Sequence, residues 1–221
     1  MSLTTKEKKN KIRKFSRKIA NIYLFELSDV FANQVYLPYS SGVIWSYLKQ
    51  DAFIAKNFQL RDWFYCREEI SSILDKIQEP DVLIFSCFMW NWELNCEIAK
   101  KVKKDNPNTL IIFGGQHQPM QDRNEGFFEK YNFVDILVHH EGEETIKEIL
   151  LGKNFDDIHG ITYNSKNTEI RTKPRKRMNS IFNNPSPYLD GSFDWIVNKN
   201  ERTKKYSLHA TVESARGCPF K

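Results

Sequence analysis

The sequence predicts an α/β fold whose centre is a doubly wound sheet of five parallel strands. Five short apolar segments are typical of buried strands, and they lie at residues 19–25, 58–66, 81–87, 109–113 and 134–138. Segments with apolar residues at helical spacing alternate with them, as in repeated βαβ units. With 221 residues, 40% of them hydrophobic and 14% aromatic, the chain can bury a sizeable core, which excludes a disordered protein.

The first half of the chain supplies two helices between its strands. A loop at residues 28–41 follows the first strand, and helical spacing begins at Val43. Ser40 or Ser41 is expected to cap this helix, because a serine oxygen accepts hydrogen bonds from the free N–H groups of a first turn. After the second strand, an apolar stripe over residues 67–78 predicts the second helix.

The second half continues the alternation and then leaves it. An amphipathic helix is expected at residues 92–104 after the third strand, a short helix at 124–131 after the fourth, and a helix at 144–151 after the fifth. Residues 161–172 have the pattern of a hairpin with an Asn-Ser-Lys-Asn turn. Residues 173–206 are rich in Pro, Asn and Ser, which predicts a linker that wraps the surface.

The net charge of +5 comes from two short basic segments. Residues 6–18 hold eight basic side chains and one acid, and residues 171–177 hold five basic side chains and no acid. The rest of the chain has 20 basic and 27 acidic side chains, so the folded body is acidic. A basic tail can contact nucleic acid, but a solvated terminus is the favoured interpretation, and we expect no nucleic-acid partner.

Membrane, secretory and disulfide-rich classes are not supported. The longest apolar run, residues 82–90, is far shorter than the ~20 residues of a membrane span. No apolar segment of a secretory signal follows the N-terminus, which favours the cytoplasm. The four cysteines, Cys66, Cys87, Cys96 and Cys218, form no close pair, which argues against a disulfide framework.

Small and polar residues follow three strands at the edge where doubly wound sheets bind ligands. A Gly-Gly pair alone would indicate a tight turn, but three such loops at matching strand ends favour a binding site. A glycine there lets a ligand approach the backbone where a Cβ would clash. The candidate binding residues in these loops are Ser86, Cys87, Trp90, Asn91, Gly114, Gly115, Gln116, Glu141 and Gly142.

The last eleven residues, Thr-Val-Glu-Ser-Ala-Arg-Gly-Cys-Pro-Phe-Lys, resemble the first strand and loop of a radical S-adenosylmethionine barrel. In that family a Glu-Thr/Ser-x-Arg-Gly-Cys-Pro stretch opens a Cys-x-x-x-Cys-x-x-Cys motif that holds an iron–sulfur cluster. The resemblance makes Cys218 the first cluster cysteine and metal ligand. The second and third cysteines are absent from the sequence, so we expect this chain to hold an incomplete cluster site and to have no catalytic residues of its own.

The region before this motif is similar to the cobalamin-binding domains that precede such barrels. Those flavodoxin-like, Rossmann-like domains carry a Ser-x-Leu-like loop after the third strand and a Gly-Gly a little under thirty residues later; here Ser86 and Gly114 are 28 positions apart. The Tyr-Leu-Pro-Tyr-Ser-Ser-Gly segment, with Tyr39 and Ser40, also looks like this family. The resemblance implies that cobalamin binds at these loops, where Ser86 would hydrogen-bond the nucleotide tail and the glycines would leave room for it.

One departure concerns the lower face of the cobalt. Cobalamin domains of the mutase type carry Asp-x-His-x-x-Gly after the first strand, whereas residues 28–41 contain no histidine and Asp29 is followed two residues later by Phe31. The resemblance therefore implies an open lower face, or one that a side chain other than histidine covers. Such a face favours methyl transfer from methylcobalamin, since the axial ligand tunes the cobalt–carbon bond. His117 is not expected to be a ligand, and neighbouring His139 and His140 point to opposite faces.

The resemblance also implies the partners. They are the corrinoid and the missing radical barrel, whose full-length parent would hold a 4Fe–4S cluster and S-adenosylmethionine and would be a methyltransferase. We expect a basic leader at residues 1–18, a cobalamin-binding domain at 19–160, a hairpin and linker at 161–205, and the beginning of the barrel domain at 206–221.

Two other classes share the predicted fold. A receiver module needs a phosphoacceptor Asp at the end of the third strand, where this sequence has Ser86 and Cys87, so that class is rejected. A flavin- or nucleotide-binding domain stays as the alternative, although no Gly-x-Gly-x-x-Gly loop follows the first strand. Retention of a corrinoid or of a flavin by the purified chain discriminates between the two.

Overall fold

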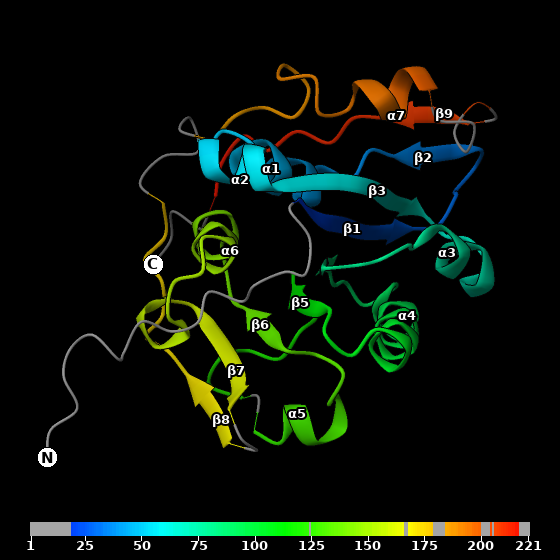
Figure 1. Ribbon diagram of the computed structural model, residues 1–221. Helices are drawn as coiled ribbons and strands as arrows, with labels where there is room; N and C mark the ends of the chain where they lie inside the picture. The colour runs from blue at the N-terminus through cyan, green and yellow to red at the C-terminus, as the bar shows by residue number, and fades with distance from the viewer. Residues whose placement is uncertain are drawn as a thin grey trace, which may run out of the picture.

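A seven-stranded sheet runs through the middle of the computed structural model (Figure 1), which describes residues 19–123, 125–165, 168–178, 184–199, 204 and 206–216. The strand order is β3-β1-β4-β5-β6-β7-β8, and the first five strands are parallel. The predicted doubly wound parallel sheet is therefore confirmed. The strands are β1 (Ala20–Ser28), β3 (Phe58–Cys66), β4 (Val82–Ser86), β5 (Leu110–Gly114), β6 (Ile136–Val138), β7 (Ile161–Ser165) and β8 (Thr168–Arg171).

The predicted hairpin is present as β7 and β8, and it extends the sheet. β7 pairs antiparallel with β6, and β8 pairs antiparallel with β7. Ile161 and Thr162 of β7 are fully buried, which shows that the strand packs like the parallel ones. The hairpin thereby covers the edge of β6, whose backbone groups would otherwise lack partners.

Helices cover both faces of the sheet. α1 (Tyr39–Leu48), α2 (Ala52–Asn57) and α6 (Glu143–Leu150) pack on one face, and α3 (Ile70–Lys76), α4 (Trp92–Asp105) and α5 (Phe127–Lys130) pack on the other. Alternate side chains of one strand enter the two cores: Ile22 and Leu24 of β1 face the first, and Tyr23 and Phe25 face the second. All five helices expected from apolar spacing are present.

The first helix begins earlier than predicted. It starts at Tyr39 after Pro38, four positions before Val43, and neither Ser40 nor Ser41 caps it. The carboxylate of Glu26, at the end of β1, instead accepts hydrogen bonds from the backbone of Ser40 (3.3 Å) and Ser41 (2.7 Å). Glu26, which is distant in sequence, therefore accepts the hydrogen bonds that Ser40 or Ser41 was expected to accept as a cap. This corrects the sequence prediction.

The structure adds short elements that the sequence pattern did not predict. β2 (Gln34–Tyr36) lies within the loop expected at 28–41, and it pairs in parallel with β9 (Ser207–His209) as a separate two-stranded sheet. A 3₁₀ turn, η1 (Phe155–Asp157), precedes the hairpin, and α7 (Asp194–Lys199) follows it. Elements of three to six residues are too short to show a clear period, so they left no signal in the sequence.

The part of the expected linker that carries α7 belongs to the packed structure. Phe193 is buried, its ring lies 5.3 Å from that of Trp63, and Ile196 is fully buried in the core beneath α1. Gly42 of α1 permits this contact, because a Cβ at Gly42 would lie 2.4 Å from Cζ of Phe193. The division into domains at residues 160 and 205 stays a prediction.

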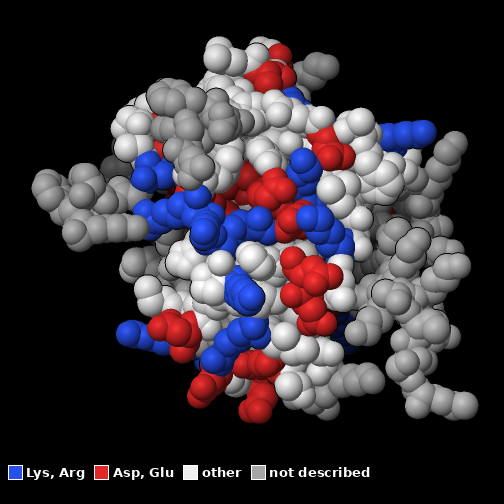
Figure 2. Space-filling model, turned by 90° about the vertical axis from the view of Figure 1, so that its left-hand side faces the viewer, with Lys and Arg blue, Asp and Glu red and all other residues white. Residues whose placement is uncertain are grey.

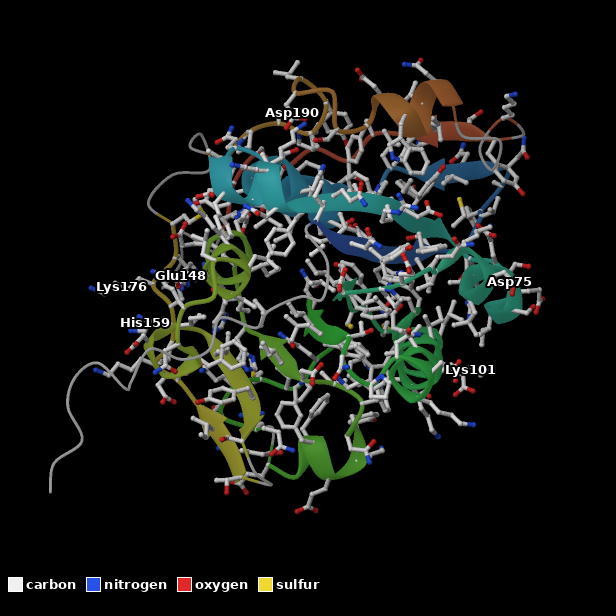
Figure 3. The ribbon with its side chains drawn as sticks, viewed as in Figure 1. Asp75, Lys101, Glu148, His159, Lys176 and Asp190 are labelled. Atoms are coloured by element: carbon white, nitrogen blue, oxygen red, sulfur yellow. The ribbon has the colours of Figure 1, made fainter. Side chains whose placement is uncertain are left out.

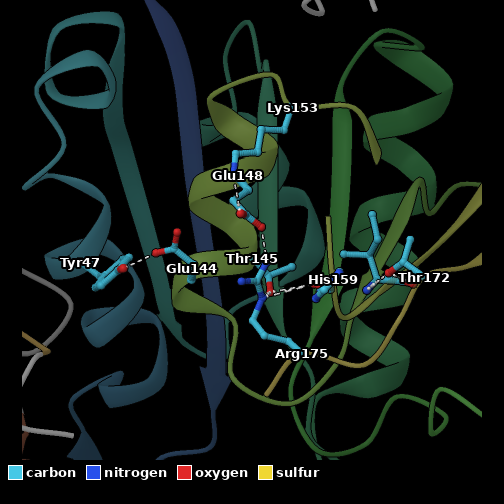
Figure 4. A network of polar contacts seen from close by, with 9 residues as sticks. Tyr47, Glu144, Thr145, Glu148, Lys153, His159, Thr172 and Arg175 are labelled. Atoms are coloured by element: carbon cyan, nitrogen blue, oxygen red, sulfur yellow. Dashed lines mark hydrogen bonds and ion pairs between the residues drawn. The ribbon is translucent and has the colours of Figure 1, made fainter. Parts of the chain in front are cut away.

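The second basic segment lies on a face where charges of both signs mix (Figure 2). Arg175 donates to Glu148 and to Oγ1 of Thr145 (2.7 Å), and Lys153 pairs with the same Glu148 at 2.5 Å (Figure 4). Lys176 is exposed at the outer side of the molecule (Figure 3). The arrangement agrees with a solvated surface built from ion pairs within the chain. The basic leader at 1–18 lies outside the described residues.

Among the described residues, no helix is both long and apolar enough to cross a bilayer.

Candidate functional site

The candidate site is the carboxyl edge of the parallel strands. The chain passes from β1 to β3 on one side of the sheet and then to β4 on the other, so the order of strands switches between β1 and β4. Open α/β sheets bind their ligands at such a switch, outside the carboxyl ends of the strands. The loops after β4, β5 and β6 and the first turn of α1 therefore converge on the edge that the sequence predicted.

Asn91 holds the loop that follows β4. Its side chain is 1% exposed, and its Nδ2 donates to the carbonyl oxygens of Leu27 and Ser86, both at 3.1 Å. Its Oδ1 accepts from the backbone of Phe88 at 2.8 Å. The amide thus ties the ends of β1 and β4 to the loop that follows β4. The polar atoms of the Asn91 side chain are hydrogen-bonded within the protein. Asn91 therefore supports the loop from within the protein, a role that we call the bracket.

Cys87 shapes the same loop through its backbone. Its N–H donates to the Gly114 carbonyl (2.8 Å), and its carbonyl accepts from the His117 N–H (3.0 Å). Its thiol is fully buried, 3.7 Å from Nδ2 of Asn95, and burial raises the pKa of that thiol. The side chain faces the core and away from solvent. Ser86, one residue earlier, is partly exposed at the end of β4.

The two glycines after β5 have different surroundings. Gly115 has φ +96°, and a Cβ there would lie 2.6 Å from both N and O of Cys87. Gly114 has no such conflict, because the nearest atom to its Cβ position is the Val138 carbonyl oxygen at 3.7 Å. Gly115 is therefore required by the turn itself, whereas the surroundings of Gly114 would accept a Cβ in ordinary van der Waals contact. Gln116 follows them with an exposed side chain.

Large apolar side chains are exposed at the ends of three neighbouring strands. Phe31 after β1 is 77% exposed, Met89 and Trp90 after β4 are 78% and 50% exposed, and Met120 after β5 is 63% exposed. Trp90 stacks on Phe88 with ring centroids 4.6 Å apart. We name Phe31, Met89, Trp90 and Met120 the apolar rim. All four follow the carboxyl ends of parallel strands, the edge at which open α/β sheets bind ligands.

Part of the rim escaped the sequence prediction. Phe31 and Met120 lie in irregular loops, where no period separates an exposed apolar residue from a buried one. Trp92, two positions after Trp90, belongs to the buried core against Phe113 and Tyr131. The apolar residues after β4 therefore divide between the rim and the core.

The loop after β6 is fixed by contacts with later segments. The Glu141 carboxylate accepts a hydrogen bond from the backbone of Met178 (2.6 Å), and Gly142 is the N-cap of α6, with Ile44 3.1 Å from its Cβ position. His139 is buried, with Nε2 2.9 Å from Oγ1 of Thr162. Burial, with the neighbouring His140, lowers the pKa of His139 to about 4, so the ring is neutral at pH 7.

The two histidines at the end of β6 do not form a ligand pair. His140 is exposed with φ +60°, whereas His139 points into the protein. No group of three or more His, Cys, Asp or Glu side chains within the described part of the chain is placed to hold a metal ion. Cys218, the metal ligand that the sequence resemblance indicates, lies outside the described residues.

The first turn of α1 completes the edge. The Tyr39 ring stacks on Tyr188 with centroids 6.2 Å apart, and Ser40 is exposed. Burial raises the pKa of the Glu26 carboxyl, while the hydrogen bonds from Ser41 and Ser40 act in the opposite direction. Glu26 was not a sequence candidate, because a single acid inside an apolar strand has no local pattern that marks it.

The fold places the chain in the class of Rossmann-like α/β domains. No established family profile matches the chain. Over 191 residues, 84% of the chain, it is 35% identical to the cobalamin-dependent radical SAM methyltransferase TokK of Streptomyces tokunonensis. Over 190 residues it is 30% identical to the 2-(S-pantetheinyl)-carbapenam-3-carboxylate methyltransferase of Streptantibioticus cattleyicolor.

The chain spans 28% of the length of each of these curated relatives. Its fold is similar to that of the radical S-adenosylmethionine methyltransferase TsrM of Kitasatospora setae, solved with cobalamin and a 4Fe–4S cluster bound. The TM-score is 0.52, and the match covers 76% of this chain and 31% of that one at 13% identity, so it concerns the fold alone. The chain is thus a homologue of one part of the cobalamin-dependent radical SAM methyltransferases.

Proposed function

We propose that this chain binds cobalamin at the carboxyl edge of its sheet, as one module of a cobalamin-dependent radical S-adenosylmethionine methyltransferase. The observation that supports this most directly is 35% identity to such a methyltransferase over 84% of the chain. The Rossmann-like fold and the apolar rim support the same conclusion independently. The iron–sulfur cluster and S-adenosylmethionine would be held by the remainder of the enzyme, with Cys218 as the first cluster cysteine.

The residues at the edge fit a large, partly apolar cofactor. Cobalamin combines a broad ring with a nucleotide tail, and the rim offers exposed aromatic and thioether side chains to such a ring. Covering about 100 Å² of this apolar surface contributes about 2.5 kcal/mol to binding, from which the cost of ordering the complex subtracts. Gly114 and Gly115 have no side chain at this strand end, which would let the tail approach the backbone closely.

The candidate residues would contribute in two ways. Ser86 and Gly114 would contact the tail directly, and the residues around it would be Gly115, Gln116, Glu141, Gly142, Tyr39 and Ser40. Asn91 and Cys87 would act from behind, because the amide of Asn91 and the backbone of Cys87 are already hydrogen-bonded and hold the loop that presents Ser86 and Trp90. A bound methylcobalamin supplies the methyl group that the whole enzyme would transfer.

The test is retention of the corrinoid by the purified chain. The chain is mixed with hydroxocobalamin, desalted and examined by absorbance, and we expect the protein fraction to keep about one corrinoid per chain. Flavin mononucleotide is run in parallel, because a flavin- or nucleotide-binding domain would retain the flavin and release the corrinoid. A colourless protein fraction, or one that holds flavin alone, would overturn the proposal.

A matched pair of variants locates the site. Gly114→Ala adds a Cβ that the structure accommodates, and we expect retention within about threefold of the wild type. Gly114→Leu adds a bulky side chain at the strand end, and we expect at least a tenfold loss of retention with an unchanged circular dichroism spectrum. Equal retention by Gly114→Leu would show that the corrinoid binds at another loop.

A further inference from the structure

The segment that carries β9 is attached to the α/β domain along its length. Ser207, Leu208 and His209 pair with β2, and the Leu37 N–H donates to the His209 carbonyl at 2.9 Å. The Tyr188 hydroxyl then donates to the Thr211 carbonyl at 2.6 Å. In Figure 1 this segment, drawn in red, runs from β9 back across the molecule toward α6. We name residues 207–216 the docked segment.

The docked segment ends in an ion pair with a buried acid. Glu143, the first residue of α6, is 3% exposed, and its Oε1 accepts from Nη1 of Arg216 at 2.6 Å and from Nδ2 of Asn184 at 3.0 Å. Nε of Arg216 donates to Glu213 at 2.8 Å. The guanidinium therefore lies between two carboxylates, which raise its pKa and keep it charged. A carboxylate this deeply buried requires such a partner.

Glu143 differs from the other buried acid of the same helix. Glu148 pairs with Arg175 and Lys153 on the outer face, away from the docked segment. Glu143 directly follows Glu141 and Gly142, two candidate residues of the corrinoid edge, and its partner Arg216 stands two positions before Cys218. Burial and the nearby charge of Glu213 raise the pKa of Tyr39, a third residue of that edge.

We propose that Glu143 is a positioning residue, which through its ion pair with Arg216 holds the segment leading to Cys218 against the edge that binds the corrinoid. The inference rests on the proposed function, because it concerns where the cluster-bearing part of the enzyme begins relative to that edge. We name this ion pair the latch; it lies at the far end of the docked segment, beyond the β2–β9 pairing and the Tyr188 contact.

Hydrogen–deuterium exchange of the 221-residue chain tests the latch. Four variants are compared with the wild type: Glu143→Gln, Arg216→Gln, the double variant and Arg216→Lys. Glu148→Gln is the matched control, because it removes a buried carboxylate from the same helix and from an arginine partner without touching the docked segment. Local opening of a segment raises its exchange without changing that of the core.

The latch predicts a local and coupled effect. Either single glutamine variant should speed exchange of peptides within 207–216 at least tenfold, while peptides of β1, β4 and β5 change less than twofold. In the double variant the docked segment should exchange no faster than in the more affected single variant. Arg216→Lys should retain part of the protection that Arg216→Gln loses. Glu148→Gln should leave the docked segment unchanged.

Three outcomes would overturn the inference: unchanged exchange of the docked segment, additive effects in the double variant, or equal loss of protection throughout the sheet. If Glu143→Gln does not fold, Arg216→Gln and Arg216→Lys decide the question, because Arg216 lies at the surface end of the pair. Hydroxocobalamin retention is measured separately on the wild type. Failure of retention with an intact latch would reject the proposed function, and retention with no local coupling would reject the latch.

Discussion

Replacing each of the two glycines after β5 by alanine should separate the turn from the binding edge. In Gly115→Ala the new Cβ would lie 2.6 Å from N and O of Cys87, and the residue would keep a φ near +96°. In Gly114→Ala the nearest neighbours are at 3.7 Å or more, which is an ordinary van der Waals contact. The two variants differ by one position and by the same added methyl group.

The magnitude follows from these distances. A non-glycine residue at such a positive φ costs about 1–3 kcal/mol. The clash adds about 1–3 kcal/mol of displacement, because Cys87 is hydrogen-bonded to Gly114 and His117 and does not move freely. We therefore expect Gly115→Ala to lower the free energy of unfolding by about 3 kcal/mol or more. Gly114→Ala should leave it unchanged or raise it by up to ~1 kcal/mol, because alanine restricts the unfolded chain.

Urea unfolding followed by tryptophan fluorescence measures both variants, and thermal unfolding gives a second readout. For a chain of this length, about 3 kcal/mol corresponds to a drop in Tm of roughly 6–12 °C. Equal destabilisation by the two substitutions would refute the distinction between a turn glycine and an edge glycine. A Gly115→Ala protein as stable as the wild type would show that the loop after β5 relaxes around Cys87.

Three further predictions follow from the buried polar groups and the rim. The pKa of His139 is about 4 in the folded chain and 6.5 when unfolded, so the unfolded state binds the proton first as the pH falls. The free energy of unfolding of the wild type should therefore fall by about 3 kcal/mol as the pH drops through this window. In urea titrations from pH 4 to 7, His139→Gln should lack that slope. Asn91→Asp places carboxylate oxygens opposite the Leu27 and Ser86 carbonyls, and thermal unfolding should show a loss of about 3 kcal/mol or more; a neutral result would contradict the bracket role. Trp90→Ala should change stability by under ~1 kcal/mol but reduce hydroxocobalamin retention several-fold, and unchanged retention would exclude the rim from the site.

The sheet was predictable because its strands are buried on both faces. Segments such as 82–86 are short and uniformly apolar, and each is followed by a helix with clear spacing, so order and type were fixed by local pattern. The pairing of β2 with β9 and the cap that Glu26 provides for α1 were not predictable. Both depend on residues far apart in the chain, and neither leaves a period or a spacing in the sequence.

The location of the candidate site could be predicted from the sequence, but the contacts within the site could not. Strand ends in a doubly wound sheet share one edge, so the amino-acid pattern alone groups Ser86, Gly114 and Glu141. Their individual roles required geometry: the sequence does not distinguish Gly114 from Gly115, and it does not show that the Asn91 amide is already engaged. The ion pair between Glu143 and Arg216 likewise joins residues with no local relation.

The pairing of β2 with β9 also determines the order in which the protein can assemble. Gln34 meets Ser207, so this contact closes nearly the whole chain into one loop, whereas every pairing of the main sheet is complete by Arg171. Closing so long a loop is entropically costly, and the pairing itself joins only three residues on each side. During synthesis the seven-stranded sheet can therefore finish before residue 207 exists, and the last stretch settles onto a surface that is already built.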